Sequence, residues 1–323
     1  MPINSPQMRM LFVPSDAQGG AFYRMQTPAS TLQESGYAHT LCHMMTYDEE
    51  SIKSLNPDVI VFQHPTTDRE IQVLRNYRRA LPKAHFVYDI DDNWLAVPDE
   101  SAHKQHLPKD IKARIVNAAN LCNSITVTTE PLKKVMQGIS SVKDIRVLPN
   151  YIPANTLQNM TRTRKQYRTG NKKIRVGWAG GIGHGGDIKL LDSLLYKLHD
   201  TVDWVFMGMT PETCDPRLFE IHAPVDVQMY HAKLASLNLD VALAPLANND
   251  FNVSKSNLRV LEYGAAGIAV LASAIEPYNS FENIQKLPFV ADVWEAAIRN
   301  LANNLDLVDD MAEKLHEDIN QNW

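Results

Sequence analysis

The chain has 323 residues, and at ~150 residues per domain this length indicates about two domains. Hydrophobic residues make up 44%, charged residues 21%, and the formal net charge is −5, which is a globular composition without the overall positive charge of a nucleic-acid-binding protein. No apolar run resembles a membrane span or a signal peptide, and the three cysteines are far apart, so we expect a cytoplasmic protein with reduced thiols and no membrane span.

Short apolar runs alternate with helical patterns in the first half of the chain. Strands are expected at residues 10–14, 58–63, 85–90, 124–128 and 145–148, with helices at 21–34, 69–81, 109–121 and 130–138. Because strands that alternate with helices form βα units, residues 1–152 predict a domain built on a parallel sheet.

Residues 153–173 interrupt this alternation and are predicted to be a basic interdomain linker. No acidic residue occurs between Asp144 and Asp187, whereas eight lysines and arginines lie there. Arg164 and Arg168 are the arginines of this band that are expected to follow a phosphate backbone, with Tyr167 available for stacking on a base. The alternative is a solvated linker.

The alternation then resumes and predicts a second parallel-sheet domain at residues 174–285. Strands are expected at 174–179, 204–208, 225–228, 239–244 and 268–272, and helices at 187–198, 231–236 and 255–266. Two further helices, at 292–304 and 307–320, lie in a C-terminal segment of residues 286–323. Ligands of such sheets bind outside the carboxyl ends of the strands, so two domains of this kind predict a cleft between them.

A glycine-rich motif, RVGWAGGIGHGGD at 175–187, follows the first strand of the second domain and contains six of the 14 glycines. Glycines let a backbone approach a ligand closely, and a helix N-terminus offers N–H groups to an anion, which favours binding of a phosphate or diphosphate. Gly181, Gly183 and Gly186 also fit G-x-G-x-x-G, so a nicotinamide-dependent oxidoreductase is an alternative. However, the acid of that motif belongs at the end of the next strand, and Asp203 lies at its start.

A second motif lies at residues 244–272, where a strand leads into the predicted helix 255–266. Lys255, Arg259 and Glu262 are spaced i, i+4, i+7 and are expected to share one helix face. Ser254 or Ser256 would cap the helix, whose first turn would face an anion. The alternative is a solvated face with an ion pair.

Together these two segments resemble the donor-binding domain of family 4 glycosyltransferases. GGAFYR at 19–24, VYDIDDNW at 87–94 and LPN at 148–150 extend the resemblance into the first half. It implies an α/β protein of the GT-B fold, with two Rossmann-like domains facing across a cleft and C-terminal helices that cross back to the first domain. It further implies transfer of a sugar from a nucleoside diphosphate sugar, such as a UDP-sugar, to a hydroxyl group, with retention and without a required cofactor.

The resemblance also implies roles for individual residues. Glu262 matches the second glutamate of the family's E-x7-E pattern, which binds the ribose, whereas Ser254 occupies the position of the first glutamate. This departure leaves a sugar-nucleotide-binding protein without catalysis as an alternative. Lys255 and Arg259 would stabilise the departing diphosphate. The implied donor-binding residues are Gly19, Gly20, Gly180, Gly181, Gly183, His184, Asp187, Ser254, Ser256 and Glu262.

Acidic residues after the third predicted strand are expected on the acceptor side. Asp91 is the candidate for deprotonating an acceptor hydroxyl, with His64 as a further catalytic candidate. The other expected acceptor-binding residues are Tyr23, Arg24, Asp89, Asp92, Arg164 and Arg168. Alternatively, Asp89 and Asp91 form a D-x-D motif that binds Mg²⁺ or Mn²⁺. A hydroxymethylated base in DNA, as in virus-encoded DNA glycosyltransferases, is one predicted acceptor, and a glycan or lipid-linked acceptor is the other.

Overall fold

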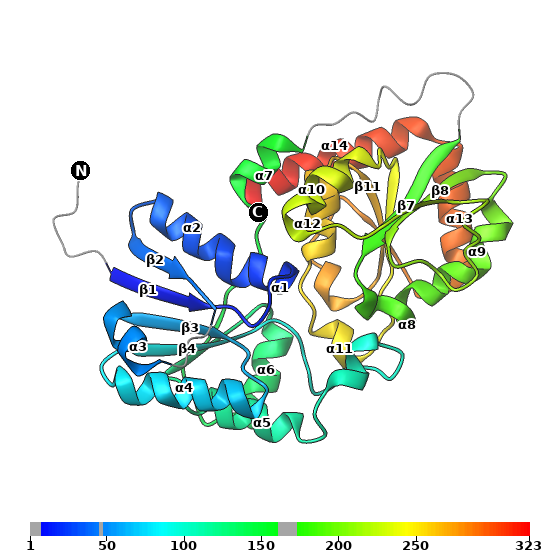
Figure 1. Cartoon of the computed structure of the whole chain (residues 1–323). Helices are drawn as coiled ribbons and strands as arrows, with labels where there is room; N and C mark the ends of the chain where they lie inside the picture. The colour runs from blue at the N-terminus through cyan, green and yellow to red at the C-terminus, as the bar shows by residue number, and fades with distance from the viewer. Residues whose placement is uncertain (1–7, 45–47, 161–172) are drawn as a thin grey trace. The chain divides into compact units, whose positions relative to one another are not determined.

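The computed structural model describes residues 8–44, 48–160 and 173–323. They form two compact units, each built on one six-stranded sheet (Figure 1). Unit 1 holds the described residues of Met1–Leu95, Pro108–Asn150 and Ser254–Ser256, and unit 2 holds those of Ala96–Leu107, Tyr151–Val253 and Asn257–Trp323. Two short segments, Ala96–Leu107 and Ser254–Ser256, therefore pack with a different unit from their neighbours along the chain.

The sheet of unit 1 is entirely parallel, with the strand order β2-β1-β3-β4-β5-β6. The order reverses at β1, so the edges of β1 and β3 mark the switch point at which ligands of such sheets bind. The strands are β1 Met8–Val13, β2 Ala38–Cys42, β3 Val59–Gln63, β4 His85–Ile90, β5 Ser124–Val127 and β6 Ile145–Val147.

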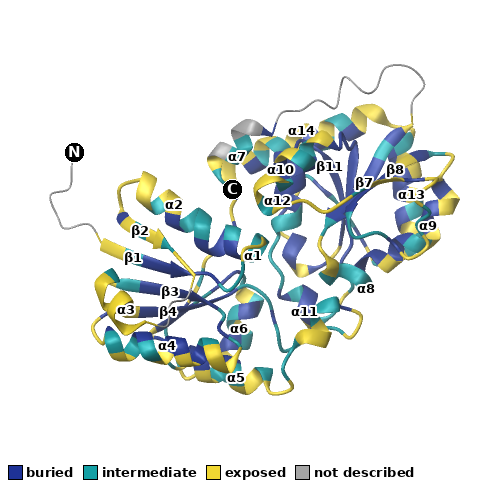
Figure 2. Ribbon diagram, viewed as in Figure 1, coloured by how far each residue is buried: buried dark blue, intermediate teal, exposed yellow. Residues whose placement is uncertain are grey.

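Helices cover both faces of this sheet because successive strand residues point to opposite sides. Phe12 and Val61 pack against Met25 on one face, whereas Leu11 and Phe62 belong to the larger core on the other. Figure 2 shows β3 and β4 as the buried centre of the unit. The helical elements are α1 Gly19–Ala21, the π-helical turn η1 Phe22–Gln26, α2 Thr27–Glu34, α3 Glu49–Leu55, α4 Asp68–Ala80, α5 Ile111–Ala119 and α6 Glu130–Ile139.

The sheet of unit 2 is also parallel, with the order β12-β11-β10-β7-β8-β9, which is the strand order of a dinucleotide-binding Rossmann fold. Its switch point lies between β7 and β10. The strands are β7 Ile174–Gly180, β8 Val202–Gly208, β9 Glu220–His222, β10 Val241–Ala244, β11 Ala269–Ser273 and β12 Gln285–Leu287. The predicted boundary at residue 285 thus falls within a strand of the sheet.

The largest core of unit 2 lies where Trp178 and Phe206 on the sheet meet Leu194, Trp294 and other residues of the helices. Helix α14 packs on α12 and β11. The helical elements are η2 Ala102–His106, α7 Ala154–Asn159, η4 Ile182–His184, α8 Gly185–Ile188, η5 Lys189–Leu191, α9 Asp192–Leu198, α10 Val227–Ser236, α11 Asp250–Val253, α12 Leu258–Ala265, η6 Glu276–Tyr278, α13 Ala291–Ala302 and α14 Leu305–Asn322. In the described part of the chain, no helix combines the length and apolar character needed to cross a membrane.

Three local predictions differ from the structure. Residues 225–228 were expected to be a strand, but the edge strand is β9, and α10 begins at Val227, because Val227, His231 and Leu234 repeat at helical spacing. The predicted helix 187–198 is divided into α8, η5 and α9. The predicted helix 255–266 begins only at Leu258, after the cap residue Asn257, which makes no side-chain capping bond.

Candidate functional site

The loops at the switch point of unit 2 are joined by the buried side chain of Asp187. Its Oδ1 accepts hydrogen bonds from the Ala247 backbone N–H (2.9 Å) and from Asn252 Nδ2 (2.7 Å), and its Oδ2 lies 2.8 Å from His184 Nδ1. Asp187 thus connects the glycine loop after β7 to the loop after β10 and fixes the His184 ring. Asp187 is a predicted donor-binding residue, and its carboxylate holds together the two loops at which the donor is expected to bind.

The glycines at the end of β7 are required for close packing. A Cβ atom at Gly177 would lie 2.1 Å from the Val205 carbonyl oxygen, and one at Gly180 would lie 2.6 Å from both Arg259 and the Trp178 ring. Among the described glycines, positive φ angles occur at Gly36, Gly208 and Gly267. Gly177 and Gly180 therefore need to be glycine for space and not for a left-handed backbone.

Arg259 and Glu262 lie together beneath this loop, on α12. Arg259 donates to the Ala179 carbonyl oxygen and, over 3.1 Å, to the Tyr230 hydroxyl, and its guanidinium lies 5.3 Å from the centre of the Trp178 ring. The Tyr230 hydroxyl donates to Glu262 Oε2 over 3.2 Å, and Arg259 Nη1 is 3.8 Å from the same oxygen. The predicted pair is therefore brought together in a buried network at the end of β7.

The tyrosines of this network keep their protons. Burial raises the pKa of Tyr230 well above its usual value and raises the pKa of Tyr263 to about 12. Burial also opposes the charge of Arg259, but its polar surroundings, with the nearby Glu262 carboxylate among them, raise the pKa of the guanidinium above its ordinary value. The network thus presents one fixed cation and one carboxylate, held by neutral hydroxyl groups. Tyr230 was not identified from the sequence, because the residues of α10 form no recognisable motif.

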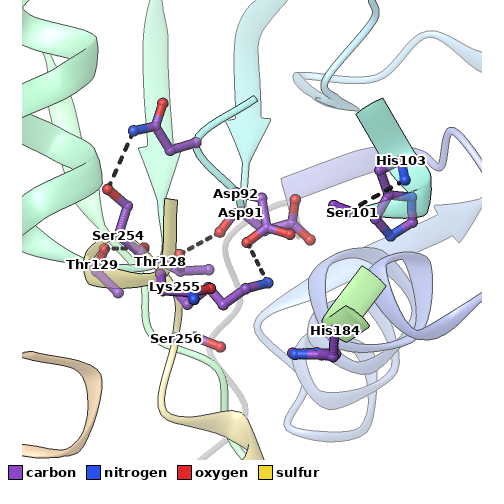
Figure 3. A network of polar contacts seen from close by, with 12 residues as sticks. Asp91, Asp92, Ser101, His103, Thr128, Thr129, His184, Ser254, Lys255 and Ser256 are labelled. Carbon is purple, nitrogen blue, oxygen red and sulfur yellow. Dashed lines mark hydrogen bonds and ion pairs between the residues drawn. The ribbon is translucent and has the colours of Figure 1, made fainter. Parts of the chain in front are cut away.

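Lys255 does not share the α12 face with Arg259. It lies before the helix, in the segment Ser254–Ser256 of unit 1, where its Nζ is 3.5 Å from Asp92 Oδ1. Figure 3 shows this lysine pointing toward Asp92, and Ser254 beside Thr129. The Thr129 hydroxyl donates to the Ser254 carbonyl oxygen over 2.8 Å, and Asn150 Nδ2 donates to the Ser256 hydroxyl over 3.1 Å. The prediction that Ser254 or Ser256 caps the helix was wrong, because α12 begins at Leu258 and Asn257 occupies the cap position.

The switch point of unit 1 brings Gly20, Gln63 and Asp91 together. Gln63 at the end of β3 accepts a hydrogen bond from the Ser15 backbone N–H over 3.0 Å, which joins it to the loop after β1. A Cβ atom at Gly20 would lie 2.9 Å from Gln63 Nε2 and 3.3 Å from Asp91 Oδ2. At Gly19, by contrast, a Cβ atom would meet nothing within 4 Å. Gln63 was missed from the sequence because it lies within the apolar run of β3.

His64 and Asp91 form the titratable pair of this site. His64 Nε2 is 3.8 Å from Asp91 Oδ1, and the imidazole lies 5.5 Å from the Trp94 ring. The His64 backbone has a φ of 23°, a left-handed conformation that histidine rarely adopts and that marks a constrained position. Burial raises the pKa of Asp91 against the effect of His64, and the nearby Asp92 and Asp89 raise it further.

Arg24 and Asp89 form a buried ion pair inside unit 1. Arg24 Nε and Nη2 donate to the two Asp89 oxygens over 3.0 and 2.6 Å, and Arg24 Nη1 donates to the carbonyl oxygen of Leu148. Thr126 adds a hydrogen bond of 2.7 Å to Asp89 Oδ2. These two predicted acceptor-binding side chains are thus engaged with each other, and Tyr23 beside them is also buried.

The D-x-D motif does not gather further metal ligands. Both Asp89 oxygens accept hydrogen bonds from Arg24, and Asp91 faces His64 instead. Over the described residues, no group of three or more His, Cys, Asp or Glu side chains is arranged to hold a metal ion.

The basic band of the predicted linker is described only at its end. Arg164, Tyr167 and Arg168 lie outside the described residues. Arg175 is described, and its guanidinium forms two hydrogen bonds of 2.9 Å with the Glu220 carboxylate. It is therefore committed to an ion pair within unit 2.

No protein-family model and no curated protein matches the chain. Solved structures do match it. HepE from Anabaena, solved with UDP and glucose, is 12% identical, with a TM-score of 0.69 over 98% of this chain and 96% of that one. Sucrose-phosphate synthase from Thermosynechococcus elongatus is 12% identical, with a TM-score of 0.68 over 97% and 94%. A trehalose-6-phosphate synthase, studied for glycosyl transfer with retention, is 10% identical, with a TM-score of 0.57 over 96% and 99%.

At these identities the likeness concerns the fold. Both six-stranded parallel sheets and nearly the whole length of the chain are matched. The predicted class, an α/β protein with two Rossmann-like domains, is thus confirmed, and the chain has the GT-B fold of glycosyltransferases.

Proposed function

We propose that the protein is a glycosyltransferase that moves a sugar from a nucleoside diphosphate sugar to a hydroxyl group, with retention of the anomeric configuration. The observation that carries the proposal is the Arg259–Glu262 network, held at the switch point of unit 2 directly beneath the glycine loop. A fold shared with glycosyltransferases and the resemblance of the motifs support the same reaction.

The donor is assigned to unit 2. Glu262 is the residue that hydrogen-bonds the ribose hydroxyls, and the loop from Gly180 to His184 lies against the diphosphate. As the glycosidic bond breaks, the electron pair leaves with the diphosphate oxygen, and the fixed guanidinium of Arg259 with the oriented ring of His184 stabilises the added negative charge. Because Arg259 is held by Ala179, Tyr230 and Trp178, it needs little reorganisation during this step.

The acceptor hydroxyl is assigned to unit 1. Among the described residues, Gln63 Nε2 and Asp91 Oδ1 are buried polar atoms without a hydrogen-bond partner. A hydroxyl group can accept from an amide and donate to a carboxylate, so it matches both. In the reaction the acceptor oxygen bonds to the anomeric carbon while its proton passes to Asp91, whose raised pKa makes it the stronger base.

The proposed acceptor classes are a hydroxymethylated base in DNA and, as the second, a glycan or lipid-linked hydroxyl. The support for DNA is the run of arginines and lysines in the sequence between residues 162 and 173. Arg175 is excluded from this role by its pairing with Glu220. Neutralising Arg162, Arg164 and Arg168 together should therefore abolish transfer to hydroxymethylated duplex while transfer to a small hydroxyl acceptor continues. Transfer to duplex that persists in this variant contradicts the role of the band.

The reaction is tested with UDP-, GDP- and ADP-sugars against a mixed pool of hydroxyl acceptors, with mass-spectrometric detection of both the glycosylated product and the released nucleotide. Nicotinamide dinucleotides serve as the comparison for binding by thermal shift, because the second strand of unit 2 lacks the acid of that motif at its end. A thermal shift with a nicotinamide dinucleotide and none with any nucleoside diphosphate sugar contradicts the proposal. Binding without product indicates a sugar-nucleotide-binding protein.

The site is tested with Glu262→Gln. Loss of a charged hydrogen-bond acceptor should weaken nucleotide binding about 10- to 100-fold. The matched control is Glu313→Gln, an exposed glutamate on α14, which should behave as the unaltered protein. Equal nucleotide affinity in both variants overturns the assignment of Glu262.

A further inference from the structure

The second half of the glycine loop is covered by the segment Ala96–Leu107, here called the strap. A Cβ atom at Gly183 would lie 2.7 Å from two atoms of the His103 ring, and one at Gly185 would lie 2.9 Å from the Glu100 carbonyl oxygen. At Gly186 it would lie 3.6 Å from the side chain of Glu100. Gly183, Gly185 and Gly186 therefore face the strap, and the first two leave no room for a Cβ atom, whereas Gly181 faces open space.

The strap is itself held in place. Val97 and Ser101 are buried, and Lys104 Nζ donates to the Val97 carbonyl oxygen over 3.0 Å. The Ser101 hydroxyl accepts a hydrogen bond from the His103 backbone N–H over 3.4 Å, at the start of η2. Figure 3 shows Ser101 and His103 on this turn and His184 on η4, and η2 and η4 are in contact. The position of the His103 ring on Gly183 is thus set by the fold of the strap.

We infer that His103 is a donor-binding residue that hydrogen-bonds the diphosphate of the nucleotide sugar from the strap. The inference rests on the proposed function, since it assumes that the glycine loop receives the diphosphate. A side chain at Gly183 or Gly185 would collide with the strap, and the strap places an imidazole at Gly183, in the turn that also carries His184. Imidazole N–H groups donate to phosphate oxygens. His103 and His184 then bind the diphosphate from two different segments of unit 2.

The decisive variants separate hydrogen bonding from packing. His103→Phe keeps a ring against Gly183 but cannot donate a hydrogen bond, whereas His103→Gln keeps an N–H donor. His106→Ala alters an exposed histidine of the same turn and is the matched control. Affinities for UDP and for uridine are measured by calorimetry, with GDP and ADP replacing UDP if they bind more tightly.

His103→Phe should weaken UDP binding about 10- to 100-fold and leave uridine binding unchanged, because uridine has no phosphate. His103→Gln should retain more of the UDP affinity, and His106→Ala all of it. If His103→Phe binds UDP as the unaltered protein does, the histidine only packs and the inference is wrong. If the unaltered protein binds no nucleoside diphosphate, the proposed function itself fails.

A second pair of variants tests whether the contact between Gly183 and His103 matters, starting from a change at the glycine. Gly183→Ala places a methyl group 2.7 Å from the His103 ring and should displace it, with a loss of UDP affinity like that of His103→Phe. In a His103→Ala background, the same Gly183→Ala change should cause little further loss, because the space is then open. Additive losses in the double variant show that the two residues do not act together.

Discussion

Replacing Asp89 with leucine should destabilise unit 1 strongly. The side chains of Arg24 and Asp89 are 1% and 2% exposed, so the change leaves a guanidinium buried with only the Leu148 carbonyl and the Asn150 amide oxygen as acceptors. Breaking a buried pair in this way costs about 3–5 kcal/mol. For a unit of this size, ~2–4 °C per kcal/mol corresponds to a fall of roughly 6–20 °C in the melting temperature.

The two units need not unfold together, so calorimetry is combined with fluorescence. Trp94 is the tryptophan of unit 1, and its signal, obtained by comparison with Trp94→Phe, identifies the transition of that unit. The double variant Arg24→Met with Asp89→Leu should recover much of the loss, because no unpaired charge remains. Arg146→Gln, in an exposed ion pair with Asp144, is the control and should leave the transition unchanged. An Asp89→Leu protein that melts normally but no longer uses acceptor would refute the structural role of this pair.

Three other outcomes are expected. Gly177→Ala should prevent unit 2 from folding, since its Cβ atom would lie 2.1 Å from the Val205 carbonyl oxygen, whereas Gly181→Ala should leave the melting temperature nearly unchanged. Asp91→Asn should lose activity and be more stable than the unaltered protein at pH 7. The pKa of Asp91 is raised in the folded state, so its ionisation at pH 7 lowers the free energy of unfolding. The difference in melting temperature between the two proteins should vanish below the unfolded-state pKa of about 3.9. Burial raises the thiol pKa of Cys122 to about 12 and that of Cys214 to about 11, so both should react slowly with a thiol reagent at pH 8, and rapid labelling of either would contradict their environment.

The central strands could be predicted from the sequence because each is a continuous apolar run buried on both faces. β4 has the predicted bounds, and β1, β3 and β7 differ by one or two residues at their ends. The edge strand β2 was not predicted, because its exposed and buried positions give no such run: His39 and Leu41 are exposed. The strap was not predicted either, since nothing in residues 96–107 indicates that they pack with the second unit.

Site residues could be predicted where a characteristic residue type follows the end of a predicted strand. They could not be predicted where a partner distant in the sequence determines what a side chain contacts. The glycine loop and Asp91 follow the carboxyl ends of β7 and β4, and Arg259 of α12 bonds to Ala179 near the end of β7. Asp89 and Asp91 look alike in the sequence, since they are two residues apart on one strand end. Arg24, 65 residues away along the chain, donates to both oxygens of Asp89, whereas Asp91 faces His64. Long-range pairing of this kind has no local signal.

The start of α12 decides which residue is assigned to neutralise the leaving group in the proposed reaction. A helix from residue 255 would place Lys255 and Arg259 side by side on one face, whereas a helix from Leu258 leaves Arg259 as its one cation in the sequence. Lys255 is instead 3.5 Å from Asp92 in unit 1, where it offsets one of the two carboxylates, Asp89 and Asp92, that act on Asp91. An arginine stacked on Trp178 and bonded to a backbone carbonyl is rigid and always charged, which a lysine in that position would not be. In the proposed reaction, the charge on the departing diphosphate is therefore assigned to Arg259 together with the two histidines of the loop and the strap, and each of the three belongs to a different element of unit 2.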